Sequence, residues 1–179
     1  MKITGAFDDS RACRASFCLL PFALRSVLVL GIGNVLMGDE GVGVHAIDAL
    51  ADEDWPEGVT LLDGGTGGFH LLGTLRDYER VILIDACADG RPAGTLGVLR
   101  PRYASDFPRS LTAHDIGLRD LIEAASVLHA LPDLTLITVS ILDIRPMTMR
   151  LSPAVAQAIP KIGRLVRTLL HAPVGAVHA

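Results

Sequence analysis

Three acidic residues stand at or near the ends of predicted buried strands, where carboxylates can do chemistry. They are Glu40, just past the apolar run 27–32, Asp63, the last residue of the run 59–63, and Asp85, near the end of the run 80–86. If these strands run parallel, their carboxyl ends share one edge of the sheet, and the three carboxylates collect there. Crowded carboxylates raise one another's pKa and can serve in acid–base catalysis.

A histidine could join this group of acids. His114 falls in the first turn of a predicted helix, 112–128, which precedes the apolar run 134–141. Two carboxylates and an imidazole make a three-ligand metal site with open positions, and such ligands suit nickel, zinc, iron or manganese. The residues alone leave both possibilities open, a metal site and an acid–base site.

Each of these residues also has an ordinary structural explanation. Glu40 could favour the dipole at a helix N-terminus, Asp63 could set a turn with the two glycines that follow it, and His114 could cap a helix. Asp85 is the strongest functional candidate, because an unpaired charge at the end of a very apolar strand is costly.

The turn after the first apolar run resembles a nucleotide-binding turn only in part. Gly31 and Gly33 fit a dinucleotide fingerprint, but Leu36 stands where its third glycine is needed. No Gly-Lys-Ser/Thr phosphate loop lies nearby, and Glu40 would repel a phosphate. The sequence also lacks a G-x-S-x-G nucleophile elbow and any serine or cysteine protease signature. A nucleotide-binding enzyme therefore remains the weaker alternative.

The order of the apolar runs predicts the fold that must position these residues. Five strands are expected, at 27–32, 59–63, 80–86, 94–100 and 134–141. Helices are expected at 41–50, shortly after 64, at 112–128, and from Ser152 and Pro153 onward with a kink at Pro160. Strands that alternate with helices predict an α/β fold, a three-layer α/β/α sandwich around a largely parallel, twisted five-stranded sheet.

Composition predicts one globular domain. Half of the 179 residues are hydrophobic and 20% are charged. We expect an N-terminal extension at 1–26, loosely ordered, a single domain at 27–171 and a C-terminal tail at 172–179. The net charge of −4, with no long basic run, argues against nucleic acid as a partner.

Location follows from the cysteines and from one apolar stretch. Cys13, Cys18 and Cys87 are few and scattered, which disfavours a disulfide framework and fits a reducing cytoplasm. The apolar stretch 16–33 contains Arg25 near its middle, which is costly in lipid, so no membrane association is expected.

The chain resembles the hydrogenase maturation endopeptidases in five segments that occur in order. They are "GIGNVLMGDEGVGVHAIDAL", "LLDGGTGGFHLLGTL", "VILIDA", "GTLGVLR" and "HDIGLRDLI". Each segment alone is a weak signal, but the combination is specific and covers about residues 27–170. One departure is Asp115, which stands where some relatives have Gln.

The resemblance implies an endopeptidase that removes a short C-terminal peptide from the large-subunit precursor of a nickel–iron hydrogenase. It implies that Glu40, Asp85 and His114 contact nickel, and that Asp63 is a candidate for catalysis beside Glu40 and Asp85. The nickel would be carried by the precursor as the recognition element and would bind this enzyme only transiently. The alternative from another class is a non-catalytic nickel carrier or maturation chaperone that uses the same ligands.

Overall fold

The computed structural model describes residues 26–68, 70–101, 103, 106, 122, 123, 125 and 132–172. His114 and most of the predicted helix 112–128 lie outside these ranges, as do residues 1–25 of the predicted extension. Within the predicted helix, Ile122, Glu123 and Ala125 are described and are helical. Ile122 and Ala125 are buried and Glu123 is exposed, as the predicted apolar stripe requires.

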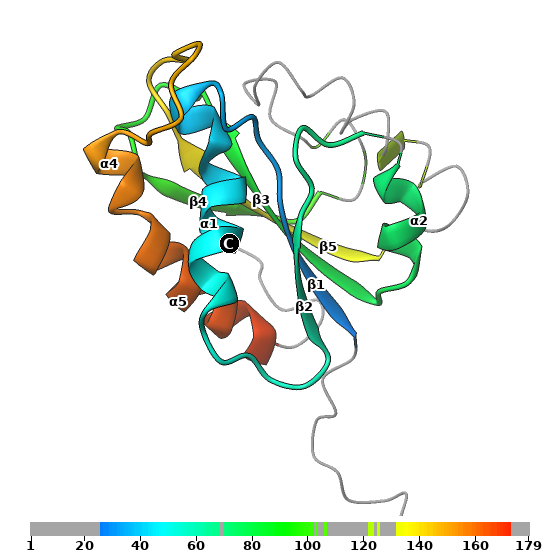
Figure 1. Ribbon diagram of the computed structural model, residues 1–179. Coiled ribbons are helices and arrows are strands. Elements are labelled where there is room, and N and C mark those ends of the chain that lie inside the picture. The colour runs from blue at the N-terminus through cyan, green and yellow to red at the C-terminus, as the bar shows by residue number, and fades with distance from the viewer. Residues whose placement is uncertain are drawn as a thin grey trace, which may run out of the picture.

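The described residues form a five-stranded sheet, as predicted. Its strands are β1 (Val27–Gly31), β2 (Val59–Asp63), β3 (Arg80–Cys87), β4 (Leu96–Leu99) and β5 (Asp133–Ser140). The spatial order is β2-β1-β3-β5-β4, and β4 alone runs antiparallel to its neighbour (Figure 1). The carboxyl ends of β1, β2, β3 and β5 therefore share one edge.

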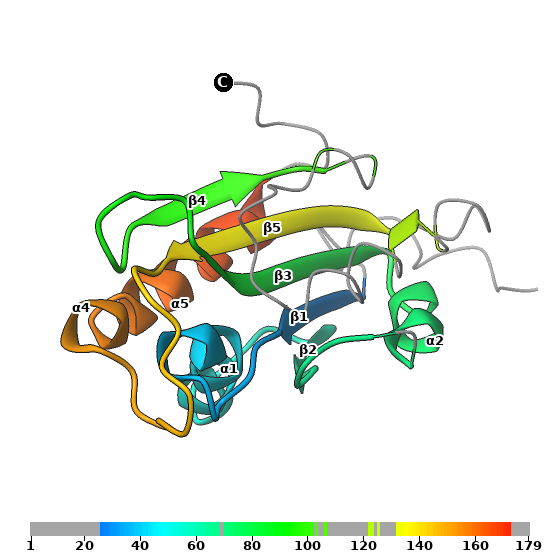
Figure 2. The same cartoon turned by 90° about the horizontal axis from the view of Figure 1, so that it is seen from above.

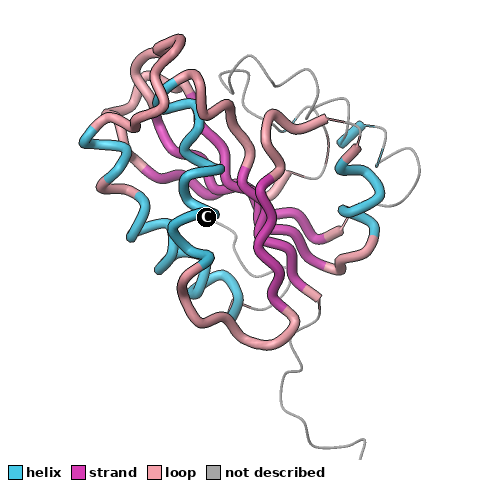
Figure 3. Tube along the Cα trace, in the orientation of Figure 1, coloured by secondary structure: helices cyan, strands magenta, loops and turns pink. Residues whose placement is uncertain are grey.

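Helices cover both faces of this sheet, which confirms the three-layer prediction. On one face lie α1 (Val42–Ala51), α4 (Pro153–Ala156) and α5 (Ile159–His171), and on the other lies α2 (Leu71–Arg76) (Figures 1 and 2). A short 3-10 helix, η1 (Gly38–Gly41), precedes α1. Figure 3 shows the loops that follow the strands at one end of the sheet, where a ligand of such a fold binds.

Two apolar cores fill the spaces between the three layers. Alternate residues of β1 face opposite cores: Val27 and Val29 pack toward α1 and α5, and Leu28 and Leu30 pack toward α2. All eight residues of β3 are buried, as a strand covered on both faces should be. This central position makes Asp85 on β3 a buried acid.

The C-terminal helical region differs from the prediction in one respect. Ser152 caps α4, since its Oγ accepts a hydrogen bond from the Val155 N–H at 3.5 Å. Pro160 does not kink a continuous helix. The chain instead breaks after α4, and Pro160 lies in the first turn of α5, where a missing N–H costs little. No helix in the described part of the chain is long and apolar enough to cross a bilayer.

Candidate functional site

The carboxyl ends of β2 and β3 are fixed around the end of β1. The Gly64 N–H donates to the Gly31 carbonyl at 2.9 Å, and the Gly33 N–H donates to the Gly65 carbonyl at 2.8 Å. On the other side, the Ile32 N–H donates to the Ile84 carbonyl at 2.9 Å. These bonds fix the positions of Asp63, the last residue of β2, and of Asp85, which lies near the end of β3.

Glycines bring η1 and α1 directly onto this edge. A Cβ on Gly31 would overlap the Gly43 carbonyl, and one on Gly43 would overlap the carbonyls of Ile32 and Ile84. Gly33 has a φ of +149°, and its Cβ would overlap the Glu40 carbonyl. The glycine pattern that resembles a nucleotide-binding turn thus allows backbone to lie against backbone.

Glu40 lies in η1 and is almost completely buried, with 1% of its surface exposed. Since η1 contacts β3, Glu40 is held beside the strand that carries Asp85. It belongs to η1 rather than to α1, whose first turn, residues 42–45, contains no acidic residue. The structure therefore brings Glu40 to the edge that the sequence predicted for it.

Asp85 is 4% exposed and pairs in register with Thr138 of β5. Its Oδ1 accepts a hydrogen bond from the Ala86 N–H at 2.7 Å. Strand alternation places Asp85 on the same face as Leu83 and Cys87, which pack with Ile122 and α2. The predicted helix 112–128 thus contributes a residue, Ile122, to the face on which Asp85 lies.

Asp63 lies at the same edge but in a different environment. It is exposed, and its Oδ1 accepts a hydrogen bond from the Gly65 N–H at 2.7 Å. This hydrogen bond closes a turn, which is the ordinary structural role that the sequence also allowed for Asp63. Asp63 pairs with Gly31 of β1, and Gly31 pairs on its other side with Ile84 of β3, so β1 lies between Asp63 and β3. Because side chains alternate along a strand, Asp63 shares a face with Ile84, and Asp85 lies on the opposite face. Two strand spacings put their Cα atoms about 10 Å apart.

Within the described ranges, no three His, Cys, Asp or Glu side chains are close enough to hold a metal ion. His114, the third ligand that the resemblance implies, lies outside these ranges. The three acids that the sequence predicted for the site differ in burial: Glu40 and Asp85 are buried, and Asp63 is exposed.

Asp39 was not among the predicted site residues, yet it fixes the site. Its side chain is buried, and its Oδ1 accepts a hydrogen bond from the Ser152 N–H at 2.6 Å. The partner is 113 residues away in sequence, so no local pattern could have indicated this contact.

The segment that precedes η1 is paired with the loop between β5 and α4. The Gly38 N–H donates to the Thr148 carbonyl at 2.6 Å, and the Thr148 N–H donates to the Leu36 carbonyl at 3.2 Å. The Arg145 N–H donates to the Met37 carbonyl at 3.3 Å. Segments from opposite halves of the sequence therefore lie side by side next to Glu40.

Hydrogen bonds to Asp89 join the loop after β3 to the end of β5. Asp89 accepts hydrogen bonds from Arg91 Nε at 2.7 Å and from Ser140 Oγ, at the end of β5, at 3.2 Å. Burial alone would raise the pKa of the Asp89 carboxyl, but these hydrogen bonds and the Arg91 charge lower it to about 2. This loop is thus tied to β5 by a charged group.

Comparison with known proteins identifies relatives of this chain. The family model described as hydrogenase maturation protease matches residues 44–168. The hydrogenase expression/formation protein HupD of Rhodobacter capsulatus is 38% identical over 153 residues, which are 83% of this chain and 73% of HupD. The hydrogenase 2 maturation protease of Escherichia coli is 33% identical over 156 residues, 84% of this chain and 94% of that protein.

Solved structures of hydrogenase maturation proteases have a fold similar to that of this chain. The hydrogenase maturating endopeptidase HybD from E. coli superimposes with a TM-score of 0.73 at 33% identity. The match covers 80% of this chain and 91% of HybD. The HybD maturation protease from Thermococcus kodakarensis matches with a TM-score of 0.65 at 26% identity, over 80% of this chain and 98% of that one.

Proposed function

Since the chain belongs to the hydrogenase maturation protease family, whose members are endopeptidases, we propose that it processes a nickel–iron hydrogenase large-subunit precursor. In this proposal it removes the C-terminal peptide, and it does so only after nickel has been inserted. The observation that carries the proposal is the pair of buried acids, Glu40 and Asp85, on adjoining elements at the carboxyl edge of the sheet.

The buried pair is suited to a cation that arrives with the substrate. Burying a carboxylate is costly unless a cation or hydrogen bonds compensate, and oxygen ligands suit divalent nickel. Glu40 and Asp85 would contact the nickel of the precursor, which is part of the substrate rather than a resident cofactor. Binding then depends on metal loading, because an apo-precursor lacks the ion that joins the two proteins.

We assign His114 as the third nickel contact. The support is that Ile122, which belongs to the same predicted helix, packs on the face of the sheet that also carries Asp85. An imidazole on that face would add a nitrogen ligand to the two carboxylates and leave positions open for ligands of the precursor.

We assign Asp63 a separate role in cleavage. It is exposed at the same edge, about 10 Å from Asp85 at the Cα atoms and on the opposite face. This separation supports a division in which Glu40 and Asp85 hold the nickel while Asp63 lies near the peptide bond. Asp63 would accept a proton from the water that attacks the carbonyl carbon, and the proton would pass to the leaving amine. The products are a new carboxyl terminus and a free peptide.

The experiment compares nickel-loaded and apo-precursor with the same enzyme preparation. Mass spectrometry should detect loss of a short C-terminal fragment from the nickel-loaded precursor alone. Equal cleavage of both forms would remove nickel as the recognition element. Binding of the loaded precursor without cleavage would favour the non-catalytic carrier.

Because the three cysteines of this chain are few and scattered, we place the reaction in the reducing cytoplasm.

A further inference from the structure

The loop between β5 and α4 exposes a group of large apolar side chains that the proposed chemistry does not use. Met147 is 89% exposed, and four others join it on the surface. We call this group the apolar loop patch: Leu36, Leu142, Ile144, Met147 and Met149. Four of these side chains belong to residues 142–149, and the fifth, Leu36, belongs to the segment whose backbone pairs with this stretch, so these exposed apolar residues are concentrated in one part of the fold rather than scattered singly.

This patch is tied to the element that carries Glu40. Leu36 belongs to the segment that pairs with the loop through the bonds of Gly38 and Thr148. The loop ends at Ser152, whose N–H is held by Asp39, the residue next to Glu40. The patch therefore has a fixed position relative to the buried acids, and a protein bound at Glu40 lies next to it.

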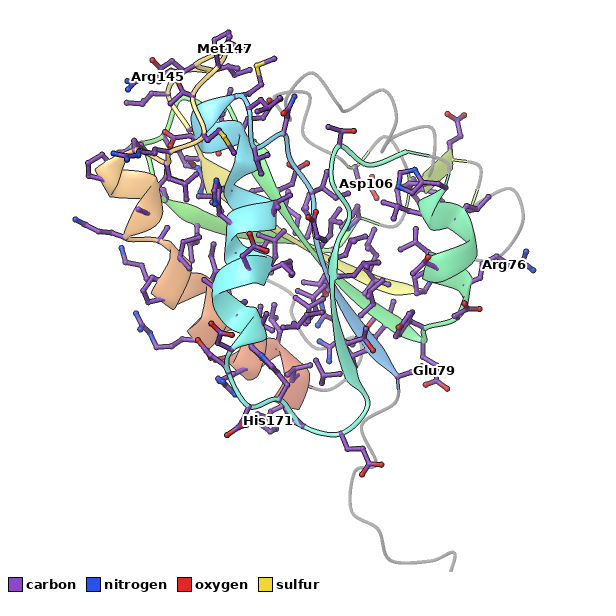
Figure 4. All side chains as sticks on the ribbon, in the orientation of Figure 1. Arg76, Glu79, Asp106, Arg145, Met147 and His171 are labelled. Carbon is purple, nitrogen blue, oxygen red and sulfur yellow. The ribbon has the colours of Figure 1, made fainter. Side chains whose placement is uncertain are left out.

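The backbone at the tip of the loop has a conformation that is unusual for the exposed apolar residue there. Met147 has a φ of +59°, in the left-handed region that methionine rarely adopts. Figure 4 shows Met147 and Arg145 at the tip of the loop, pointing away from the body of the domain. Pro146 and Met147 form a turn that leaves the methionine side chain without burial, and such an outlier is a starting point for a hypothesis of function.

The charges around the patch indicate the chemistry of its partner. Arg145 pairs with Asp143 at 3.0 Å, whereas Arg150 is exposed and makes no ion pair with any residue that the structure describes. Residues 142–150 thus carry one excess positive charge on a chain whose net charge is −4. A partner that complements this loop has apolar side chains next to an acidic one.

We propose that the apolar loop patch docks an apolar segment, flanked by an acidic side chain, on the surface of the large-subunit precursor. This inference rests on the proposed function and adds a second recognition element to the nickel. Methionine side chains are flexible and polarizable, so the patch can adapt to the surface it meets. Its role is to bind precursor in the ground state and in the transition state alike, which affects KM more than kcat.

The test is a triple variant, Leu142→Gln with Met147→Asn and Met149→Gln. Asparagine tolerates the left-handed backbone of Met147, so the turn is kept while the apolar side chains are lost. We expect KM for the nickel-loaded precursor to rise about tenfold or more and kcat to change less than about twofold. Leu99→Gln is the matched control, because Leu99 is exposed on β4 opposite Leu136, away from the loop. It should leave KM unchanged.

The charge at the edge of the patch gives an independent readout. Arg150→Glu should also raise KM, by a larger factor at low than at high ionic strength, because salt screens exposed charges. An equal change at all salt concentrations would contradict an acidic partner group.

The outcomes separate this inference from the proposed function. An unchanged KM for the triple variant, with active wild type, overturns the docking role of the patch. Failure of wild type to cleave any loaded precursor overturns the proposed function instead. If the triple variant does not melt cooperatively, Met147→Asn alone decides, since it removes a single exposed side chain. A wild-type dimer, or binding to anionic lipid vesicles, that the variant abolishes would assign the patch to that partner and overturn the proposal.

Discussion

The Oδ1 atom of Asp39 accepts a hydrogen bond from the backbone N–H of Ser152 at 2.6 Å, across 113 residues of sequence. Ser152 in turn caps α4 with its hydroxyl, so one residue joins η1 to the start of that helix. Asp39 and Glu40 are adjacent and both buried, yet Asp39 bonds η1 to the residue before α4, while Glu40 lies beside β3. The acidic pair therefore divides into a positioning residue and a candidate nickel contact.

Replacing Asp39 should separate its acceptor role from its charge. Asp39→Ala removes the acceptor for the Ser152 N–H, and we expect the free energy of unfolding in urea to fall by about 1–3 kcal/mol. Asp39→Asn keeps an oxygen acceptor and should lose clearly less. If the two variants lose the same free energy, the hydrogen bond is not what Asp39 contributes.

Neutral replacements of the buried acids should abolish processing without harming the fold. Glu40→Gln and Asp85→Asn keep the side-chain shape but weaken a metal contact, so cleavage of loaded precursor should fall by about 100-fold or more. Their free energies of unfolding should stay close to that of wild type, because each amide keeps the size and shape of the acid it replaces. Asp48→Asn, an exposed acid of α1, is the control and should cleave normally. Normal cleavage by either buried variant would remove that residue from the site.

Asp63→Asn should lower turnover more than precursor binding. The amide oxygen of asparagine can still accept the bond from the Gly65 N–H at 2.7 Å, so the turn is kept and only the base is lost. We expect kcat to fall at least about 100-fold, within the range of general-base catalysis, with KM little changed. Equal losses in kcat and in precursor affinity would point to a positioning role, and Asp63→Ala should then show the larger loss of stability.

The local signals in the sequence were strong enough to predict the layers of this fold. The apolar runs at β1, β3 and β5 are buried strands, and the carboxyl edge is marked by Gly31 at the end of β1 and by Asp85 near the end of β3. The sequence predicts a kink at Pro160, whereas the chain breaks between α4 and α5, because a sequence shows that a helix is interrupted but not whether the chain continues as one helix or two.

The site could be predicted only as an edge, not as an arrangement. Strand endings place Glu40, Asp63 and Asp85 at one edge, but the register that sends Asp63 and Asp85 to opposite faces depends on pairing with β1. The bond from Ser152 to Asp39, and the one from Ser140 to Asp89, join residues far apart in sequence. Such contacts follow from tertiary packing and leave no periodic signal.

Acid should expose the contribution of Asp89. Because its pKa is lowered from 3.8 to about 2 in the folded state, Asp89 stabilises the fold above pH 3.8, and this stabilisation is lost as the pH falls through about 2. Asp89→Asn lacks this dependence, so its free energy of unfolding should fall less than that of wild type between about pH 4 and pH 2. Urea unfolding at several pH values measures the difference. A wild-type profile for Asp89→Asn would contradict the network.

Two glycines in helices should respond in opposite ways to the same substitution. Gly43 in α1 faces the carbonyls of Ile32 and Ile84, and a methyl group there would overlap backbone atoms that cannot move aside. Gly43→Ala should therefore destabilise the fold by about 3 kcal/mol or more, beyond the usual range for a single substitution. Gly73 in α2 is exposed, and a Cβ added to it would meet no atom within 4 Å, so Gly73→Ala should stabilise by roughly 0.5–1 kcal/mol. Thermal and urea unfolding measure both. A harmless Gly43→Ala would show that α1 can move away from the strand ends, and the fixed position of Glu40 beside β3 would then lose its basis.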